Sequence, residues 1–214
     1  SGPDGGDTGN GFLSREDFIE LLVYAKQKNV TVIPQISFPS HARAAIIAMK
    51  SRTKRLREAG DYDGAHQFSL SDPDDKSIYQ SAQLYNDNAI NICMESSYTF
   101  FQKVVDEVLK MYLDAGLQLK QFSIGADELP YGVWENSPIC LDNLKPNNSI
   151  GGLYDANIYR LKEILNKHGI TLSGWEDFML ERSEKSQSET KIKSEHYNYE
   201  VIPYVWNNTW GEGR

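Results

Sequence analysis

Four short apolar segments, separated by amphipathic ones, constrain most strongly what this chain can fold into. The first of them is β-branched and apolar on both faces, which is typical of a strand buried in a parallel sheet. The predicted strands cover residues 30–36, 121–129, 170–175 and 201–206. Strands that alternate with helices predict βα units around a parallel sheet.

The amphipathic segments repeat their apolar residues at the spacing of an α-helix. In the first of them Phe18, Leu21, Leu22 and Ala25 share one face, and Ser14 is predicted to cap the N-terminus. The predicted helices cover residues 14–29, 39–60, 98–116 and 154–168.

The predicted fold class is α/β, as a (β/α)8 barrel of which residues 1–214 form roughly the middle half. Four strands do not close a barrel of this kind. The chain begins without an initiating Met or a signal peptide, so we expect a fragment or a processed product. Residues 61–96 have little periodicity and many turn residues, which predicts a long loop inserted in one partial catalytic domain.

The residues that follow the four strands are polar or aromatic, and (β/α)8 barrels carry their chemistry at these ends. Asp127 and Glu128 are the central pair. Neighbours on a strand point to opposite faces, so both can reach one pocket only where the strand ends. Two carboxylates in one pocket repel, which raises one pKa and leaves the other group ionised. The alternative is a solvated acidic pair at the start of a loop.

The composition argues against several classes of function. With 22 Lys+Arg against 30 Asp+Glu, the formal net charge is −8, so neither a nucleic-acid partner nor an anionic membrane partner is expected. No apolar run approaches the about 20 residues that span a membrane. The four His show no paired ligand spacing, and the glycine-rich residues 5–11 lack the Lys of a phosphate loop. No metal and no cofactor are therefore expected.

Motifs spread along the chain resemble those of family 20 glycoside hydrolases, the β-N-acetylhexosaminidases and chitobiases. Residues 33–45, IPQISFPSHARAA, resemble the family's P-E-I-D-x-P-G-H-A-R-A segment, and residues 123–128, SIGADE, resemble its H-x-G-G-D-E strand. Residues 70–75 and 91–97 are similar to linking segments of the chitobiase branch. The likeness spans nearly the whole chain, but only the middle of the family's barrel.

The resemblance implies a retaining mechanism in which the substrate supplies the nucleophile, an exception to the usual scheme of two carboxylates. Glu128 would protonate the glycosidic oxygen and later deprotonate the attacking water. Asp127 would hold the N–H of the 2-acetamido group, whose oxygen attacks the anomeric carbon. His41 would lie near Glu128 and tune its proton affinity.

The same resemblance implies a wall of aromatic side chains around the terminal sugar. Trp175, Trp206 and Trp210 would form that wall, and Arg43 of the H-A-R-A segment is a further candidate for substrate binding. The alternative for the three Trp is a place in the barrel core. The expected partner is a carbohydrate with a terminal β-linked N-acetylhexosamine.

Three departures from the motifs keep two other interpretations open. The family's Glu and Asp are Gln35 and Ser37 here, and its His is Ser123. These changes fit a sugar-binding or structural relative that turns over little substrate, although Asp127 and Glu128 disfavour it. The other alternative is one chain of an assembly, with the rest of the barrel supplied by a second polypeptide or a homo-oligomer.

Cys93 and Cys140 are both expected on the face that carries the site, and we favour a disulfide between them over two free thiols. Such a bond forms in an oxidising compartment, so we expect a secreted, periplasmic or lysosomal protein. Sequons at Asn29, Asn147 and Asn207 permit glycosylation there.

Overall fold

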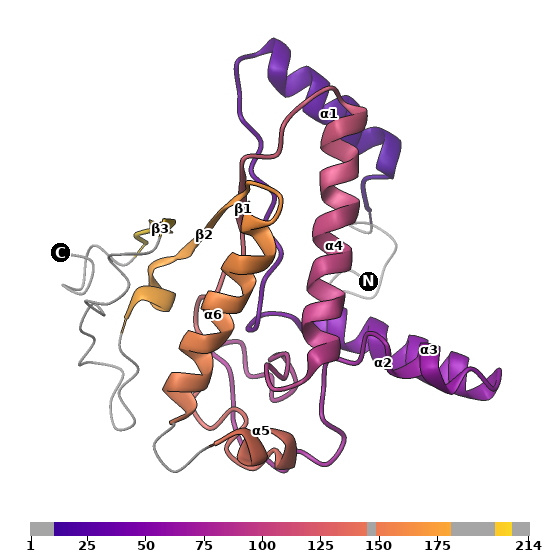
Figure 1. Cartoon of the computed structure of the whole chain (residues 1–214), viewed down its shortest axis with the longest axis vertical. Helices are drawn as coiled ribbons and strands as arrows, with labels where there is room; N and C mark the ends of the chain where they lie inside the picture. Colours follow the sequence, from indigo (N-terminus) through magenta and orange to yellow (C-terminus); the bar gives the residue numbers. More distant parts are fainter. Residues whose placement is uncertain (1–10, 145–148, 181–199, 207–214) are drawn as a thin grey trace.

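The computed structural model describes residues 11–144, 149–180 and 200–206, and all structural statements concern these residues. Short parallel strands lie beside two long helices, and α2 and α3 extend to one side (Figure 1). The helices are α1 Arg15–Gln27, α2 Arg43–Glu58, α3 Tyr62–His66, α4 Glu95–Asp114, α5 Pro138–Asn143 and α6 Ile150–Asn166. The strands are β1 Gln121–Ser123, β2 Thr171–Trp175 and β3 Val201–Tyr204, and a 3-10 turn, η1, covers Glu176–Met179.

The sheet has the order β1-β2-β3, and every pair in it is parallel. Phe122 lies opposite Leu172, and Leu172 lies opposite Val201. On the other edge of β1, a parallel bridge joins Gln35 to Ser123. Four segments of the chain therefore run side by side in one direction, as the sequence predicts.

The predicted strand over residues 30–36 is only partly correct. Regular pairing is limited to the bridge at Gln35, and Val30 and Ile33 are exposed, so the segment is not buried on both faces. Among the described residues β1 is its one strand neighbour, which leaves its second edge unpaired. Side chains on an edge of this kind are not covered on both sides.

Helix boundaries follow the predicted periodicity with shifts at the N-termini. Ser14 caps α1 as predicted, because its Oγ accepts from the Asp17 amide and the Asp17 carboxylate accepts from the Ser14 amide. The second helix begins at Arg43 instead of residue 39, since His41 has a φ of 53°, which a right-handed helix does not allow. Helix α6 begins at Ile150, four residues before the predicted start, with Ser149 as its cap.

The core lies between the sheet and the helices α4 and α6. Phe101 of α4 packs edge-on against Phe38 and Phe122, with ring centroids 5.5 Å and 5.9 Å away. Leu161 and Leu165 of α6 are fully buried, and α6 packs on β2. Phe122, the middle residue of β1, is therefore buried under α4, and β2 beside it is covered by α6.

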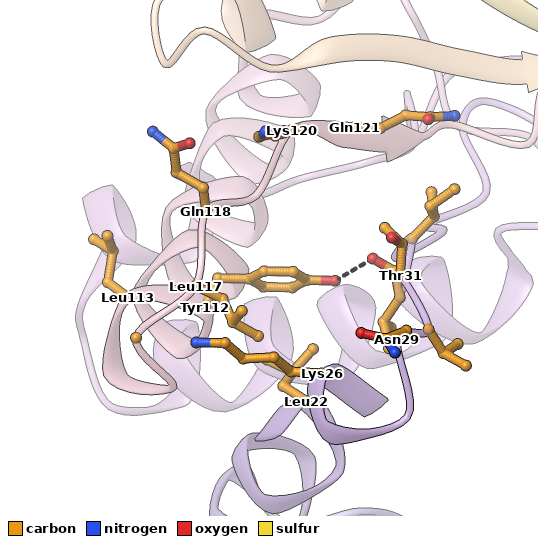
Figure 2. A pocket seen from close by; sticks show the side chains of 14 residues that line it. Leu22, Lys26, Asn29, Thr31, Tyr112, Leu113, Leu117, Gln118, Lys120 and Gln121 are labelled. Atoms are coloured by element: carbon orange, nitrogen blue, oxygen red, sulfur yellow. Dashed lines mark hydrogen bonds between the residues drawn. The ribbon is translucent and has the colours of Figure 1, made fainter. Parts of the chain in front are cut away.

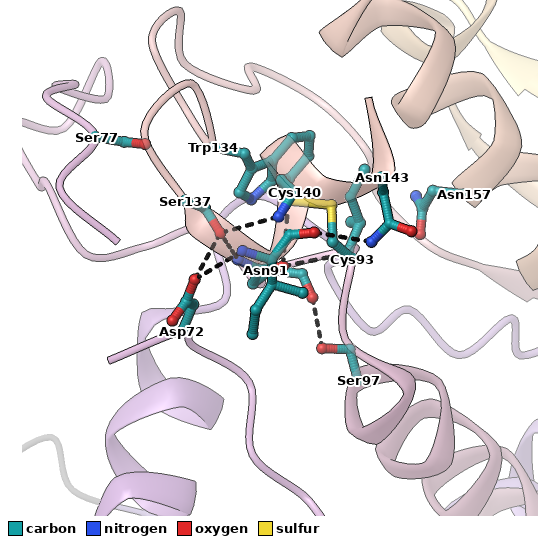
Figure 3. Close-up of a disulfide and its surroundings, with 12 residues drawn as sticks. Asp72, Ser77, Asn91, Cys93, Ser97, Trp134, Ser137, Cys140, Asn143 and Asn157 are labelled. Carbon is teal, nitrogen blue, oxygen red and sulfur yellow. Dashed lines mark hydrogen bonds between the residues drawn. A yellow bond between two sulfur atoms is a disulfide. The ribbon is translucent and has the colours of Figure 1, made fainter. Parts of the chain in front are cut away.

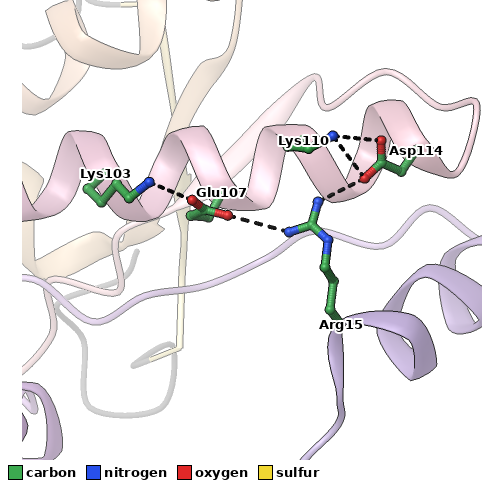
Figure 4. Close-up of polar contacts among 5 residues, drawn as sticks. All are labelled: Arg15, Lys103, Glu107, Lys110 and Asp114. Atoms are coloured by element: carbon green, nitrogen blue, oxygen red, sulfur yellow. Dashed lines mark hydrogen bonds and ion pairs between the residues drawn. The ribbon is translucent and has the colours of Figure 1, made fainter.

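An ion-pair network joins α1 to α4 on the surface (Figure 4). The Arg15 guanidinium lies 2.8 Å from Asp114 and 3.4 Å from Glu107, while Lys110 and Lys103 pair with the same two carboxylates along α4. These pairs are solvent-exposed and screened by water and salt, so each contributes little to the stability of the contact. Within the described residues no helix is both long and apolar enough to span a bilayer.

Candidate active site

The site begins where β1 loses its strand geometry. The sequence predicts a strand to residue 129, but regular pairing ends at Ser123 because Gly125, Ala126 and Glu128 all have positive φ angles of 49° to 66°. Positive φ is uncommon for side chains other than Gly and persists where the surroundings hold it. Here the buried Tyr154 hydroxyl donates to the Ala126 carbonyl oxygen at 3.1 Å. The turn places the two acidic side chains next to one imidazole.

His41 lies between Asp127 and Glu128. Its Nε2 is 3.3 Å from Asp127 Oδ2 and 3.4 Å from Glu128 Oε2. Neither contact has the geometry of a hydrogen bond, so the attraction depends on a protonated imidazole. The preceding residue holds this segment in place, because the Ser40 hydroxyl donates to the Asp127 carbonyl oxygen at 2.5 Å.

The carboxyl group of Asp127 titrates above its ordinary range. Burial raises the pKa of Asp127, and the nearby charges of Asp177 and Glu128 raise it further, whereas His41 lowers it. The site thus combines a desolvated carboxyl group with a second one that is one-third exposed. Two carboxyl groups in different environments can take different roles in proton transfer.

A third carboxylate links Glu128 to the aromatic side of the site. Asp177, in η1 after β2, accepts from the Glu128 backbone N–H at 3.1 Å through Oδ1 and from the Trp206 indole N–H at 2.8 Å through Oδ2. Trp206 follows β3 and is half exposed. Trp175, at the end of β2, meets the Tyr204 ring edge-on at 6.0 Å. The ends of all three strands therefore meet at this site.

Arg43 and Trp210 are the other two residues that were predicted to bind substrate. Arg43 is bound to the long loop, since its Nε lies 2.7 Å from Asp87 and its guanidinium stacks on Tyr85. Trp210 lies outside the described residues. Trp134, which was not among the predicted site residues, is fully buried and donates to the Ile90 carbonyl oxygen, so it belongs to the core.

The three residues that depart from the family motifs form one neutral cluster. The Ser123 hydroxyl donates to Gln35 Oε1 at 3.1 Å and accepts from the Gly125 amide at 3.3 Å. A Cβ added at Gly125 would lie 3.2 Å from the Ser37 hydroxyl, so this cluster closes around the glycine. The family motifs have Glu, Asp and His at these three positions. The amide and hydroxyl side chains of this chain leave no buried charge unpaired there.

Two residues at the site had not been selected from the sequence, Asp177 and Gln83. Asp177 follows the Trp-Glu pair at the end of a predicted strand, and that position was its signal. Gln83 lies in the long loop and donates to Glu128 Oε2 at 2.8 Å. No motif or periodicity marks it in the sequence.

His41, Asp127 and Glu128 could also hold a metal ion, since one ligand atom from each lies within 4.8 Å of the others. The same three groups are sufficient for transferring a proton between a carboxyl group and a bound substrate.

A disulfide joins the long loop to the segment after the site, as we favoured from the sequence (Figure 3). Cys93 and Cys140 are bonded, and a polar network lies beside the bond. Asn91 donates to the Ser137 hydroxyl at 2.9 Å, and that hydroxyl donates to the buried Asp72 carboxylate at 2.8 Å. The loop and the segment after β1 are thus fixed to each other covalently and by hydrogen bonds.

Comparison with known proteins gives one consistent family. The family model described as "Glycosyl hydrolase family 20, catalytic domain" matches residues 3–209. A beta-hexosaminidase of Vibrio vulnificus is 40% identical over 181 residues, which are 83% of this chain and 21% of that protein. An N,N'-diacetylchitobiase of Vibrio harveyi is 44% identical over 129 residues, 60% of this chain and 15% of that protein. The chain spans about a fifth of the length of the curated relatives it matches.

Solved structures agree with this assignment. A family 20 exo-β-N-acetylglucosaminidase of Vibrio harveyi, solved in complex with N-acetylglucosamine, has a TM-score of 0.68 and 28% identity over 92% of this chain and 26% of its own. Dispersin B is similar in fold alone, with a TM-score of 0.56 and 21% identity over 95% of this chain and 45% of its own. These neighbours are (β/α)8 barrels, so the prediction that the chain forms part of such a barrel is confirmed.

Proposed function

Since this chain belongs to glycosyl hydrolase family 20, we propose that it is the part of a β-N-acetylhexosaminidase that carries the acid and its partners. The substrate would be a glycan or chitooligosaccharide that ends in β-linked N-acetylglucosamine or N-acetylgalactosamine. One observation carries the proposal: Asp127, Glu128 and His41 converge at the ends of parallel strands, at the positions that match the family's motifs. That edge is where (β/α)8 barrels perform their chemistry.

In the first step the glycosidic bond breaks and the substrate's own acetamido oxygen forms a bond to the anomeric carbon. Glu128 gives its proton to the departing oxygen, which takes the electrons of the broken bond. The resulting oxazolinium ion carries a positive charge, and the Asp127 carboxylate accepts a hydrogen bond from its N–H. A fixed carboxylate at this position both orients the acetamido group and stabilises the charge that develops.

In the second step water opens the cyclic intermediate. Glu128, now ionised, takes a proton from the water while the water oxygen forms a bond to the anomeric carbon, and the bond to the acetamido oxygen breaks. The anomeric configuration is retained because two inversions occur. Asp177 supports both steps by holding the Glu128 backbone and the Trp206 indole through its two oxygens.

Release of nitrophenol from 4-nitrophenyl-β-N-acetylglucosaminide tests the proposal when the purified protein is compared with its Glu128→Gln variant. We expect the substitution to lower kcat by about 10²–10⁴-fold, because nitrophenol leaves with little help from an acid but the water of the second step still needs Glu128 as its base. Glu135→Gln is the matched control, since Glu135 is an exposed carboxylate outside the site. Absence of turnover in a folded parent protein that still binds N-acetylglucosamine would favour a sugar-binding relative instead.

The compartment and the state of assembly complete the proposal. We infer an oxidising compartment, outside the cytosol, from the disulfide between Cys93 and Cys140. Glycosylation at Asn29 is compatible with its exposed position, whereas Asn147 and Asn207 lie outside the described residues. A second chain or a homo-oligomer that completes the barrel would appear in light scattering as a mass above that of the monomer.

A further inference from the structure

The contact between Gln83 and Glu128 points to a role for the long loop in substrate choice. We propose that Gln83 determines specificity for the leaving-group sugar, the residue on the far side of the scissile bond from the terminal N-acetylhexosamine. This inference rests on the proposed function. It begins from a hydrogen bond across 45 positions of the chain, in which Gln83 Nε2 donates to Glu128 Oε2 at 2.8 Å.

The loop that carries Gln83, residues 79–90, is attached at its C-terminal end to the segment that carries His41. The Ala42 amide donates to the Asn88 carbonyl oxygen at 2.9 Å, and the Ile90 amide donates to the Pro39 carbonyl oxygen at 2.8 Å. Both bonds connect backbones, so this part of the loop keeps a fixed place beside the site.

The tip of the loop is also held by specific bonds. Ser81 is buried, its amide donates to the Tyr85 carbonyl oxygen at 2.8 Å, and its hydroxyl accepts from the Tyr85 amide at 3.1 Å. A further bond, from the Leu84 amide to the Ser81 carbonyl oxygen, closes the turn around Gln83. The exposed Gln83 side chain therefore projects from a defined turn.

Arg43 secures the same loop from the side of α2. Its guanidinium pairs with Asp87 at 2.7 Å and lies 5.0 Å from the centre of the Tyr85 ring. We selected Arg43 from the sequence as a residue that binds substrate, and the structure gives it this supporting contact. Its charge is thereby partly neutralised, which suits a loop that meets neutral sugar hydroxyls.

The place of the contact determines which part of the substrate Gln83 can reach. Glu128 must pass its proton to the glycosidic oxygen, so that oxygen has to come within hydrogen-bond distance of the carboxyl group. A side chain already bonded to Oε2 is then a close neighbour of the first atoms of the leaving group. The Gln83 amide offers two N–H donors and one carbonyl acceptor, a set that matches sugar hydroxyl and acetamido groups.

Gln83 could instead act only by orienting Glu128, and substrates with different leaving groups separate the two roles. A nitrophenyl group leaves with little help from an acid, and a methyl group needs the acid but offers no hydroxyl groups. A second N-acetylglucosamine needs the acid and also presents polar groups to the loop. A residue that acts through Glu128 would affect the methyl glycoside and the disaccharide alike.

The test compares kcat/KM for 4-nitrophenyl-β-N-acetylglucosaminide, methyl-β-N-acetylglucosaminide and N,N'-diacetylchitobiose. For Gln83→Ala we expect a loss of about tenfold on the disaccharide, as for one or two hydrogen bonds, and at most about threefold on the other two substrates. Gln80→Ala is the matched control, because Gln80 is exposed in the same loop. It should leave all three values unchanged.

Three outcomes would overturn the inference. An equal loss on the methyl glycoside and the disaccharide would assign Gln83 to the positioning of Glu128. Unchanged turnover of the disaccharide would show that the loop does not meet the leaving group. A parent protein that is inactive on all three substrates would remove the proposed function itself, and with it this inference.

Discussion

The two ends of the parallel strands differ in what they offer to a ligand. At the carboxyl end, Asp127 and Glu128 lie beside His41 in a turn with positive φ angles, and Asp177 accepts a hydrogen bond from the Glu128 amide. At the amino end a cavity of about 1010 Å³ opens between α1, α4 and the first residues of the strand segments (Figure 2).

The cavity at the amino end has volume without reactive groups. Its lining has aliphatic, amide and hydroxyl side chains and two lysines, Lys26 and Lys120, but no carboxylate and no imidazole. The phenol of Tyr112 is already bonded to the Val32 carbonyl oxygen at 2.8 Å (Figure 2). The comparison favours the end where carboxylates and an imidazole converge as the place of the proposed chemistry, and not the end that has the cavity.

Replacing Asp127 should show most clearly that the carboxyl ends of the strands differ in function from the amino ends. We expect Asp127→Asn to lower kcat by about 10²–10³-fold, as when one group that stabilises the transition state is removed, because an amide cannot offset positive charge on the intermediate. Burial raises the pKa of Asp127. As the solution is acidified, the parent protein should therefore lose activity at a higher pH than it would if Asp127 were an exposed aspartate. Measurements of kcat and of kcat/KM across a range of pH values test the two effects.

An exposed aspartate provides the control for this change. Asp142 lies on the surface of α5, and Asp142→Asn should keep both the rate and the acidic limb of the profile. If Asp127→Asn retained full activity in a folded protein, the strand ends would no longer be the site of the reaction.

Removal of the disulfide should have the next largest effect, which is a loss of stability near the carboxyl ends of the strands. Cys93 and Cys140 are 47 positions apart, and closing a loop of this length stabilises the fold by about 4 kcal/mol in the chain-entropy model. Replacing both cysteines by serine should therefore lower the free energy of unfolding by about 2–4 kcal/mol. Denaturant titration measures that loss.

Hydrogen exchange locates the same effect. Amides of residues 70–93 and 134–140 should exchange faster in the double serine variant, while those of α1 and α4 should keep their protection. Dithiothreitol should reproduce this pattern in the parent protein and have no effect on the variant. Equal acceleration at both ends would mean that the disulfide stabilises the whole fold uniformly.

The sequence predicted the elements of the fold better than their ends. The helical spacing of apolar residues identified α1, α4 and α6, because each helix buries one face. The apolar content of short segments identified the parallel strands, because a strand in such a sheet is buried on both faces. The end of β1 was placed too late: Gly125 permits a positive φ, but nothing in the letters of Ala126 and Glu128 reports the positive φ angles that these residues also adopt. The late start of α2 has the same cause at His41.

At the site, the sequence identified side chains that belong to motifs and missed those that act through the fold. Asp127, Glu128 and His41 were selected together, and the structure brings them together. Gln83 reaches Glu128 only because a loop without periodicity folds back over 45 positions. Contacts of this kind depend on tertiary structure, which local patterns do not encode.

Tyr112 gives the smallest expected effect, at the amino end. Tyr112→Phe removes the hydroxyl that donates to the Val32 carbonyl oxygen, so the free energy of unfolding should fall by about 1 kcal/mol at neutral pH, with kcat unchanged. Tyr24→Phe is the control, because Tyr24 is an exposed residue of α1. A large loss of activity in the Tyr112 variant would break the distinction between the two ends.

The difference in the free energy of unfolding between the parent and the Tyr112→Phe variant should also change with pH. Burial raises the pKa of Tyr112 from 10.0 to about 12, so the folded protein holds the phenol proton more tightly than the unfolded chain does. The stabilisation is therefore complete below pH 10 and is lost as the pH rises towards 12, because the unfolded chain ionises first. Denaturant titrations between pH 7 and pH 11 should show the parent losing stability above pH 10 while the Phe variant lacks this contribution. A constant difference across that range would show that the Tyr112 phenol is not desolvated, and the cavity end would then be open to water.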